Sequence, residues 1–279
     1  AFIIQAISYE YRSKPDNFLG AKTYEVFLFI NGALGTILLG TAVATFFTGS
    51  EFSVNAMNFS KWEGAARGLE LALNFHNVSL GLAVFFLARV LAILYFMYNI
   101  EDENIFNRSR KQLVFNTIPL VVFFLVFLIW LMFIDGFAYD PLTKKVSYES
   151  YKYLQNFLQM PLVLVIFLLG VLLVLFGIGK SVLKKSFNGI WYSGAGTILT
   201  VFALFLIAGF NNTAFYPSTF DLQSSLTIEN ASSSKYTLKA MSYVSLMVPF
   251  VIAYIWYAWK SINNKKINAE EMSEDIHIY

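Results

Sequence analysis

Six long stretches of this 279-residue chain are almost free of charge, and Arg89 is the one charged residue within them. They cover residues 26–50, 77–100, 112–134, 153–179, 186–220 and 240–259. About 20 mostly apolar residues suffice for a helix to cross a hydrocarbon core of about 30 Å. Helices also satisfy every backbone polar group within the segment, as lipid requires. The sequence therefore predicts an all-α fold, a polytopic transmembrane helix bundle with six full spans.

The first nine residues form a further uncharged run, which is too short to span a bilayer. It leads into Glu10, Arg12 and Lys14, and it lacks the basic start of a signal peptide. We expect it to be the end of an earlier spanning helix. On this interpretation the chain is an N-terminally truncated fragment, and residues 1–279 form a single membrane-embedded domain.

The amino-acid composition indicates which surroundings and partners the chain can have. Charged residues make up 14% of the chain, whereas soluble domains contain about 25%. A formal net charge of +2 does not indicate a nucleic-acid partner, and membrane lipid is the expected surrounding. The absence of cysteine excludes thiolate metal sites and iron–sulfur clusters from this chain.

The distribution of Lys and Arg predicts the orientation. One set of alternate loops, beginning with the loop at Arg12, carries twelve of these residues, and the other set carries seven. Because basic residues collect in cytoplasmic loops, we expect the Arg12 loop and the C-terminus to be cytoplasmic. The loops near residues 51–76, 135–152 and 221–239 are then external.

Two local patterns predict further features. The external segment 50–75 carries apolar side chains at helical spacing, which favours a short amphipathic helix: Trp62, Ala65, Leu69 and Leu73. The first full span carries small residues that suit close helix–helix approach: Gly32, Gly35 and Gly40.

Only two histidines are present, and neither indicates a metal or haem site. His277 is in the C-terminal tail, and His76 lies at the outer mouth of the second span. A haem bound within a helix bundle requires His, Met or similar ligands that project inward at membrane depth. We interpret His76 as an interfacial histidine with satisfied hydrogen bonds. No zinc spacing, phosphate-binding loop or nucleophile–histidine–acid arrangement is present, so the chain alone is not catalytic.

Arg89 is the candidate buried charge, because it lies near the middle of its span. A central Arg costs about 2.5–3.5 kcal/mol on insertion scales, so such residues normally face protein or water. None of the six stretches contains Asp or Glu. The partner is therefore either a set of carbonyls, hydroxyls and water, or a carboxylate outside this chain.

Several short motifs, in order along the chain, resemble one family. They are Tyr-Glu-Tyr-Arg-Ser-Lys at 9–14, Ile-Asp-Gly-Phe at 134–137, Tyr-Pro-Ser at 216–218, Ser-Leu-Thr-Ile at 225–228, Ala-Ser-Ser-Ser at 231–234 and Thr-Leu-Lys-Ala-Met at 237–241. Together they resemble subunit II of the cytochrome bd-type quinol oxidases of bacteria. The resemblance covers essentially the whole chain.

This resemblance implies a division of labour within a respiratory complex of the bacterial cytoplasmic membrane. The partner, subunit I, would carry haem b and haem d and oxidise quinol with O2 as acceptor. The present chain would be the haem-free membrane subunit and would bind no cofactor itself. The resemblance also implies that about 100 residues of the family pattern, including its first helices, precede residue 1.

The resemblance further implies a proton route from the cytoplasm through subunit II. Glu10 matches an acidic position of that route, and Tyr279 matches the terminal tyrosine of the family. The alternatives are a solvated carboxylate beside Arg12 and Lys14 for Glu10, and an ordinary chain end for Tyr279.

The sequence is also compatible with two other functional classes. A secondary transporter would usually show paired repeats with interrupted helices in corresponding positions. Pro161 and Pro249 are not obviously symmetric, which argues against that class. A purely structural membrane scaffold is the other alternative, and the sequence does not separate it from an oxidase subunit.

Overall fold

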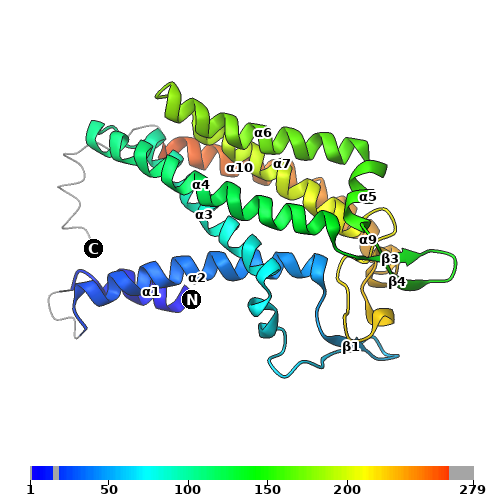
Figure 1. The fold of residues 1–279 in the computed structure, drawn as a ribbon. Coiled ribbons are helices and arrows are strands. Elements are labelled where there is room, and N and C mark those ends of the chain that lie inside the picture. Colours follow the sequence, from blue (N-terminus) through cyan, green and yellow to red (C-terminus); the bar gives the residue numbers. More distant parts are fainter. Residues whose placement is uncertain (1, 15–18, 264–279) are drawn as a thin grey trace.

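The computed structural model describes residues 2–14 and 19–263 (Figure 1). Its helices are α1 (Phe2–Tyr11), α2 (Ala21–Thr48), α3 (Phe75–Asn99), α4 (Glu103–Phe133), α5 (Lys152–Gln159), α6 (Pro161–Leu183), α7 (Gly189–Gly209), α8 (Ile228–Ala231), α9 (Lys235–Ser245) and α10 (Val248–Ile262). Two 3-10 turns are η1 (Leu69–Leu73) and η2 (Leu222–Ser224). Four short strands form two antiparallel hairpins: β1 (Phe52–Val54) with β2 (Ser60–Trp62), and β3 (Gly136–Asp140) with β4 (Lys145–Glu149).

Six helical segments of the described chain are long and apolar enough to cross a membrane. They are Ala21–Thr48, Phe75–Asn99, Glu103–Phe133, Pro161–Leu183, Gly189–Gly209 and Lys235–Ile262. The last segment consists of α9 and α10, with Pro249 in the first turn of α10. The prediction of an all-α polytopic membrane bundle is therefore confirmed.

The connections gather at two opposite ends of the bundle (Figure 1). Both hairpins lie at one end, which we call the hairpin end. The C-terminal end of α1, the N-terminal end of α2, the α3–α4 and α6–α7 connections and the C-terminal end of α10 lie at the other. We call this second end the basic end, because its loops and helix ends carry residues such as Arg108, Lys184 and Lys260. The N-terminal half of α2, with α1 beside it, extends away from α4, α6 and α7.

Two predicted spans are shorter in the structure than in the sequence pattern. The stretch 153–179 divides at Pro161, which occupies the first turn of α6, so that residues 152–159 form the separate helix α5. A proline has no N–H for the preceding turn, and it therefore begins a helix more readily than it continues one. The stretch 186–220 stops being helical at Gly209, because Asn211 and Asn212 take positive φ angles of 57° and 55°. Residues 210–220 belong to the loops of the hairpin end.

The predicted amphipathic helix within residues 50–75 is wrong. The segment forms the β1–β2 hairpin followed by the short turn η1. Positive φ angles at Asn58, Arg67 and Gly68 turn the chain where a helix would have to continue. The apolar residues of this segment do recur at helical spacing, but the turn conformations between them prevent a continuous helix.

Glycines allow two pairs of neighbouring helices, α2 with α3 and α6 with α7, to approach closely. A Cβ on Gly40 of α2 would lie 2.8 Å from Cα of Gly81 on α3, and a Cβ on Gly177 of α6 would lie 2.5 Å from the carbonyl oxygen of Gly189 on α7. The predicted close approach is confirmed for Gly40. A Cβ on Gly32 or Gly35 would meet no described atom within 4 Å, so these two positions mark no contact within residues 2–14 and 19–263.

An aromatic cluster joins the helices at the hairpin end. The Phe47 ring lies 5.9 Å from Phe127 and 5.2 Å from Tyr153, measured between ring centroids. The Tyr153 hydroxyl donates a 2.9 Å hydrogen bond to the Phe47 carbonyl, and its side chain is fully buried. Burial raises the pKa of Tyr153, so the phenol stays protonated and remains a donor.

Candidate functional site

Arg89 of α3 forms a polar contact with α4 at the middle of the bundle. Its Nε donates a 2.6 Å hydrogen bond to Oδ1 of Asn116, and its guanidinium carbon lies 5.7 Å from the centroid of the Phe85 ring. Asn116 is 1% exposed, and its Nδ2 donates to the Gln112 carbonyl at 2.7 Å. Arg89 itself is half-buried, and no described carboxylate forms an ion pair with it. The arrangement supplies an acceptor for the cation without a second charge.

His76 lies in the first turn of α3 and is 2% exposed. Its ring stacks on Phe127 at 4.8 Å between centroids and also contacts Trp130 at 5.3 Å. Nε2 lies 3.3 Å from the Phe127 carbonyl oxygen, and Nδ1 has no hydrogen-bond partner among the described residues. Since a carbonyl oxygen only accepts, Nε2 carries the proton in this contact. The imidazole is therefore enclosed by α4, although its hydrogen bonds are only half satisfied.

Glu10 lies at the basic end, in the last turn of α1. Its carboxylate forms a 3.0 Å ion pair with Lys14, and the two side chains are 61% and 49% exposed. The group is therefore accessible from water. Such an exposed pair contributes little to stability.

A second polar contact lies deeper between α1 and α2. Asn31 of α2 is 7% exposed, and its Nδ2 donates a 3.0 Å hydrogen bond to Oε1 of Gln5. The Asn31 Oδ1 atom is buried and has no partner among the described residues. Ser8, which is fully buried one turn from Gln5, donates to the Ile4 carbonyl at 2.6 Å.

The sequence interpretation missed the amides that make these contacts. Asn116, Asn31 and Gln5 are uncharged, so each was counted simply as part of an uncharged stretch. A search for buried amides within apolar spans would have found them, because a polar group in hydrocarbon needs a partner. Tyr279 and His277 lie outside the described residues.

The hairpin end carries the charged contacts with shifted pKa values. Glu229 of α8 forms a 2.8 Å ion pair with Lys144 and accepts a 2.5 Å hydrogen bond from the Tyr139 hydroxyl. The contact with Lys144, followed by that with Tyr139, lowers the pKa of Glu229. These exposed groups connect α8 to the β3–β4 hairpin and form no enclosed site.

Comparison with known proteins identifies the family. The sequence pattern of cytochrome bd terminal oxidase subunit II matches residues 1–262. The chain belongs to this family. The relative from Escherichia coli strain K12, cytochrome bd-I ubiquinol oxidase subunit 2, is 27% identical over an alignment of 293 positions, which covers 99% of this chain and 74% of the relative. A probable cytochrome oxidase subunit 2 from Haemophilus influenzae is 24% identical over an alignment of 272 positions, which covers 93% of this chain and 69% of the relative.

The cytochrome bd family implies haem in the assembled complex, and a haem held by helices needs an inward-facing ligand such as His or Met. His76 does not fit, because Phe127 covers its ring face and occupies Nε2 with its carbonyl. No group of three or more His, Asp or Glu side chains arranged for a metal ion occurs in residues 2–14 and 19–263. Among the described residues, His76 therefore directs Nε2 to a backbone carbonyl and not to an open ligand position.

Proposed function

We propose that this chain is the haem-free membrane subunit of a bacterial bd-type quinol:oxygen oxidoreductase. Subunit I of the complex would hold haem b and haem d and oxidise quinol, and the present chain would support it. The observation that supports this division is the burial of His76 against Phe127 and Trp130, with Nε2 facing the Phe127 carbonyl. The name of the Escherichia coli relative, a ubiquinol oxidase subunit, supports quinol as the substrate of the complex.

As a supporting subunit, the chain would use the exposed face of α2 to pack against another helix. Phe29 and Leu39 are 62% and 63% exposed, and Gly32 and Gly35 have open space where a Cβ would stand. Glycines in a membrane helix favour close approach of another helix, whereas lipid chains have no need of them. This face would therefore contact a helix that lies outside the described residues.

The chain would also supply a proton path that begins at Glu10. We place the basic end in the cytoplasm, because Lys and Arg concentrate there. Gln5 and Asn31 lie deeper than Glu10, since five residues of α1 rise about 7.5 Å. The buried Asn31 Oδ1 is an acceptor to which a water or hydroxyl could donate, as a relay needs. Tyr279 remains a candidate of the same path.

An optical spectrum of the isolated complex tests the assignment. The full-length protein is purified with its natural partners, and the reduced-minus-oxidised spectrum is recorded before and after the subunits are separated. We expect b- and d-type haem bands in the complex, and all haem in the fraction that lacks this chain. A complex without haem would refute the oxidase assignment, and haem retained by this chain would refute its haem-free role.

A further inference from the structure

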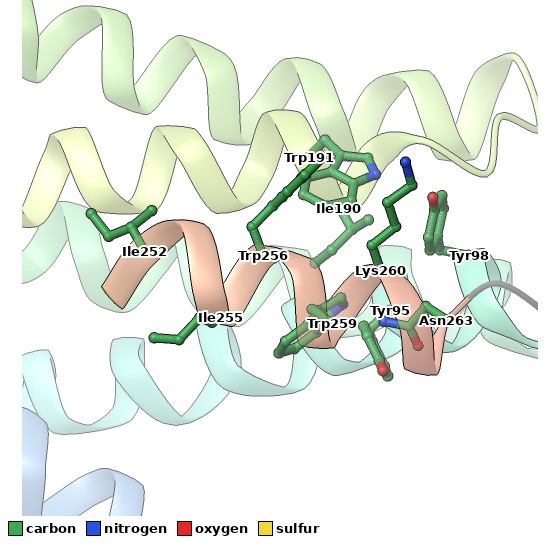
Figure 2. Close-up of a pocket in the computed structure, with 10 residues that line it drawn as sticks. All are labelled: Tyr95, Tyr98, Ile190, Trp191, Ile252, Ile255, Trp256, Trp259, Lys260 and Asn263. Carbon is green, nitrogen blue, oxygen red and sulfur yellow. The ribbon is translucent and has the colours of Figure 1, made fainter. Parts of the chain in front are cut away.

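A hollow of about 560 Å³ opens at the basic end, between α10 and the helices α3 and α7 (Figure 2). We call it the α10 groove. Two aromatic pairs link the three helices around it. Tyr95 of α3 lies 6.1 Å from Trp259 of α10, and Tyr98 of α3 lies 5.9 Å from Trp191 of α7, measured between ring centroids. Pockets of 300–1,000 Å³ are typical of small-molecule sites.

The length of the groove matches one leaflet of a bilayer. Its lining runs along α10 from Ile252 to Asn263. Eleven residues of helix rise about 16 Å, which is about half of a hydrocarbon core of about 30 Å. A spanning protein helix would require a groove of twice this length. The groove therefore suits a ligand whose apolar part crosses one leaflet only.

The two parts of the groove differ in chemistry. The deeper part is lined by Ile252 and Ile255 of α10, which are apolar. Lys260 lies at the mouth, with Nζ 5.2 Å from the centroid of the Trp256 ring. Figure 2 shows the Lys260 side chain pointing from α10 toward the side of Trp191 and Tyr98.

The cation at the mouth has no counter-charge in the described chain. Lys260 forms no ion pair within residues 2–14 and 19–263, and the residues that line the groove include no Asp or Glu. The Asn263 side chain adds an amide at the same level. A ligand for this groove thus has a long apolar part and one anionic head.

From these observations we propose that the α10 groove binds an anionic glycerophospholipid. The phosphodiester pairs with Lys260, and an acyl chain lies along Ile252 and Ile255, between α10 and the helices α3 and α7. Tyr and Trp rings are well suited to the level of the head group, because they combine an apolar body with a polar tip. The lipid fills the space beside α10, none of whose residues is buried by the described chain. This inference concerns the membrane surface of the chain and does not rest on the oxidase function.

Photo-crosslinking in the assembly with which the full-length protein purifies tests this proposal. The probe is phosphatidylglycerol with a diazirine in one acyl chain, and cross-linked peptides of α10 and α7 are quantified by mass spectrometry. We expect cross-links at the groove that unlabelled phosphatidylglycerol displaces more effectively than phosphatidylcholine with the same acyl chains. A basic residue near a membrane surface contributes about 1 kcal/mol toward anionic lipid, which is about fivefold in binding.

Two variants and a matched control locate the site. Lys260→Gln should lower the cross-linking yield at the groove about fivefold. Lys184→Gln, which replaces the exposed lysine directly after α6 at the same end, should leave the yield unchanged. Ile255→Trp should lower the yield by filling the apolar part while Lys260 is kept. Equal losses from Lys260→Gln and Lys184→Gln would overturn the proposal, because the attraction would then be a general property of the basic end. Cross-links confined to another subunit or to other helices would overturn it as well.

Discussion

Arg89 on α3 and Asn116 on α4 are joined by a hydrogen bond of 2.6 Å between Nε and Oδ1. Arg89 is fourteen residues from the start of α3 and ten from its end, so this contact lies well inside the bilayer. An amide partner solvates the cation without adding a desolvated carboxylate. The hydrogen bond therefore links α3 and α4 at a depth where little water is present to solvate the Arg89 cation.

Removal of Asn116 should disturb the protein more than removal of Arg89. Asn116→Leu deprives a charged donor of its acceptor, which typically costs about 1.5–3 kcal/mol, whereas Arg89→Leu removes the charge itself. Assembly yield and thermal stability of the purified complex measure the effect, and the double variant should resemble Arg89→Leu. Asn116→Asp, which keeps an acceptor, is the control. A loss in Arg89→Leu as large as in Asn116→Leu would instead indicate a carboxylate partner outside the described residues.

Replacement of His76 should leave haem content unchanged. His76→Ala removes a ring that stacks on Phe127 and a contact with its carbonyl, so some loss of stability is expected. His76→Phe keeps the stacking and should restore part of that stability. Optical spectra of both assembled variants should contain every haem band of the unmodified complex. Loss of one b-type band in a fully assembled His76→Phe complex would contradict the proposed haem-free role.

Neutralisation of Glu10 should slow turnover without affecting assembly. Glu10→Gln keeps the shape of the side chain but removes its titration, so proton delivery from the basic end should be impaired. The deficit in quinol oxidase rate should grow from neutral to alkaline pH, where protons are scarcest. Glu101→Gln, an exposed carboxylate in the α3–α4 connection at the same end, is the matched control. Identical rate–pH profiles for the two variants would reduce Glu10 to a solvated carboxylate.

Substitution at Gly177 should weaken the contact between α6 and α7. A Cβ there would lie 2.4 Å from the Ser193 hydroxyl and 2.5 Å from the Gly189 carbonyl, so Gly177→Ala forces the helices apart and should cost about 1–3 kcal/mol. Gly179→Ala is the control on the same helix, because a Cβ at Gly179 meets no described atom within 4 Å. Thermal denaturation of the purified complex should show a lower midpoint for Gly177→Ala only. A neutral result would mean that the helix pair adjusts without loss.

The location of helix ends could be predicted only in part from the sequence. Hydropathy marks where apolar residues lie, but it does not distinguish a spanning helix from an apolar loop that packs on the bundle. Residues 210–220 are uncharged and nevertheless leave α7, because Asn211 and Asn212 turn the chain and Asn211 Nδ2 donates to Asn156 at 3.0 Å. Tertiary hydrogen bonds thus decided the boundary.

The sequence by itself determined that this chain is a bundle of membrane helices, because long uncharged segments are stable in lipid only when each satisfies its own backbone. It also carried the resemblance to bd oxidase subunit II, which the family comparison confirms. Only the tertiary structure decided which side chains meet. The pairing of Arg89 with Asn116, the enclosure of His76 by Phe127 and the α10 groove each depend on the rotation and spacing of separate helices. Those quantities are set by packing between distant segments, such as the contact of Gly40 with Gly81, and not by local composition.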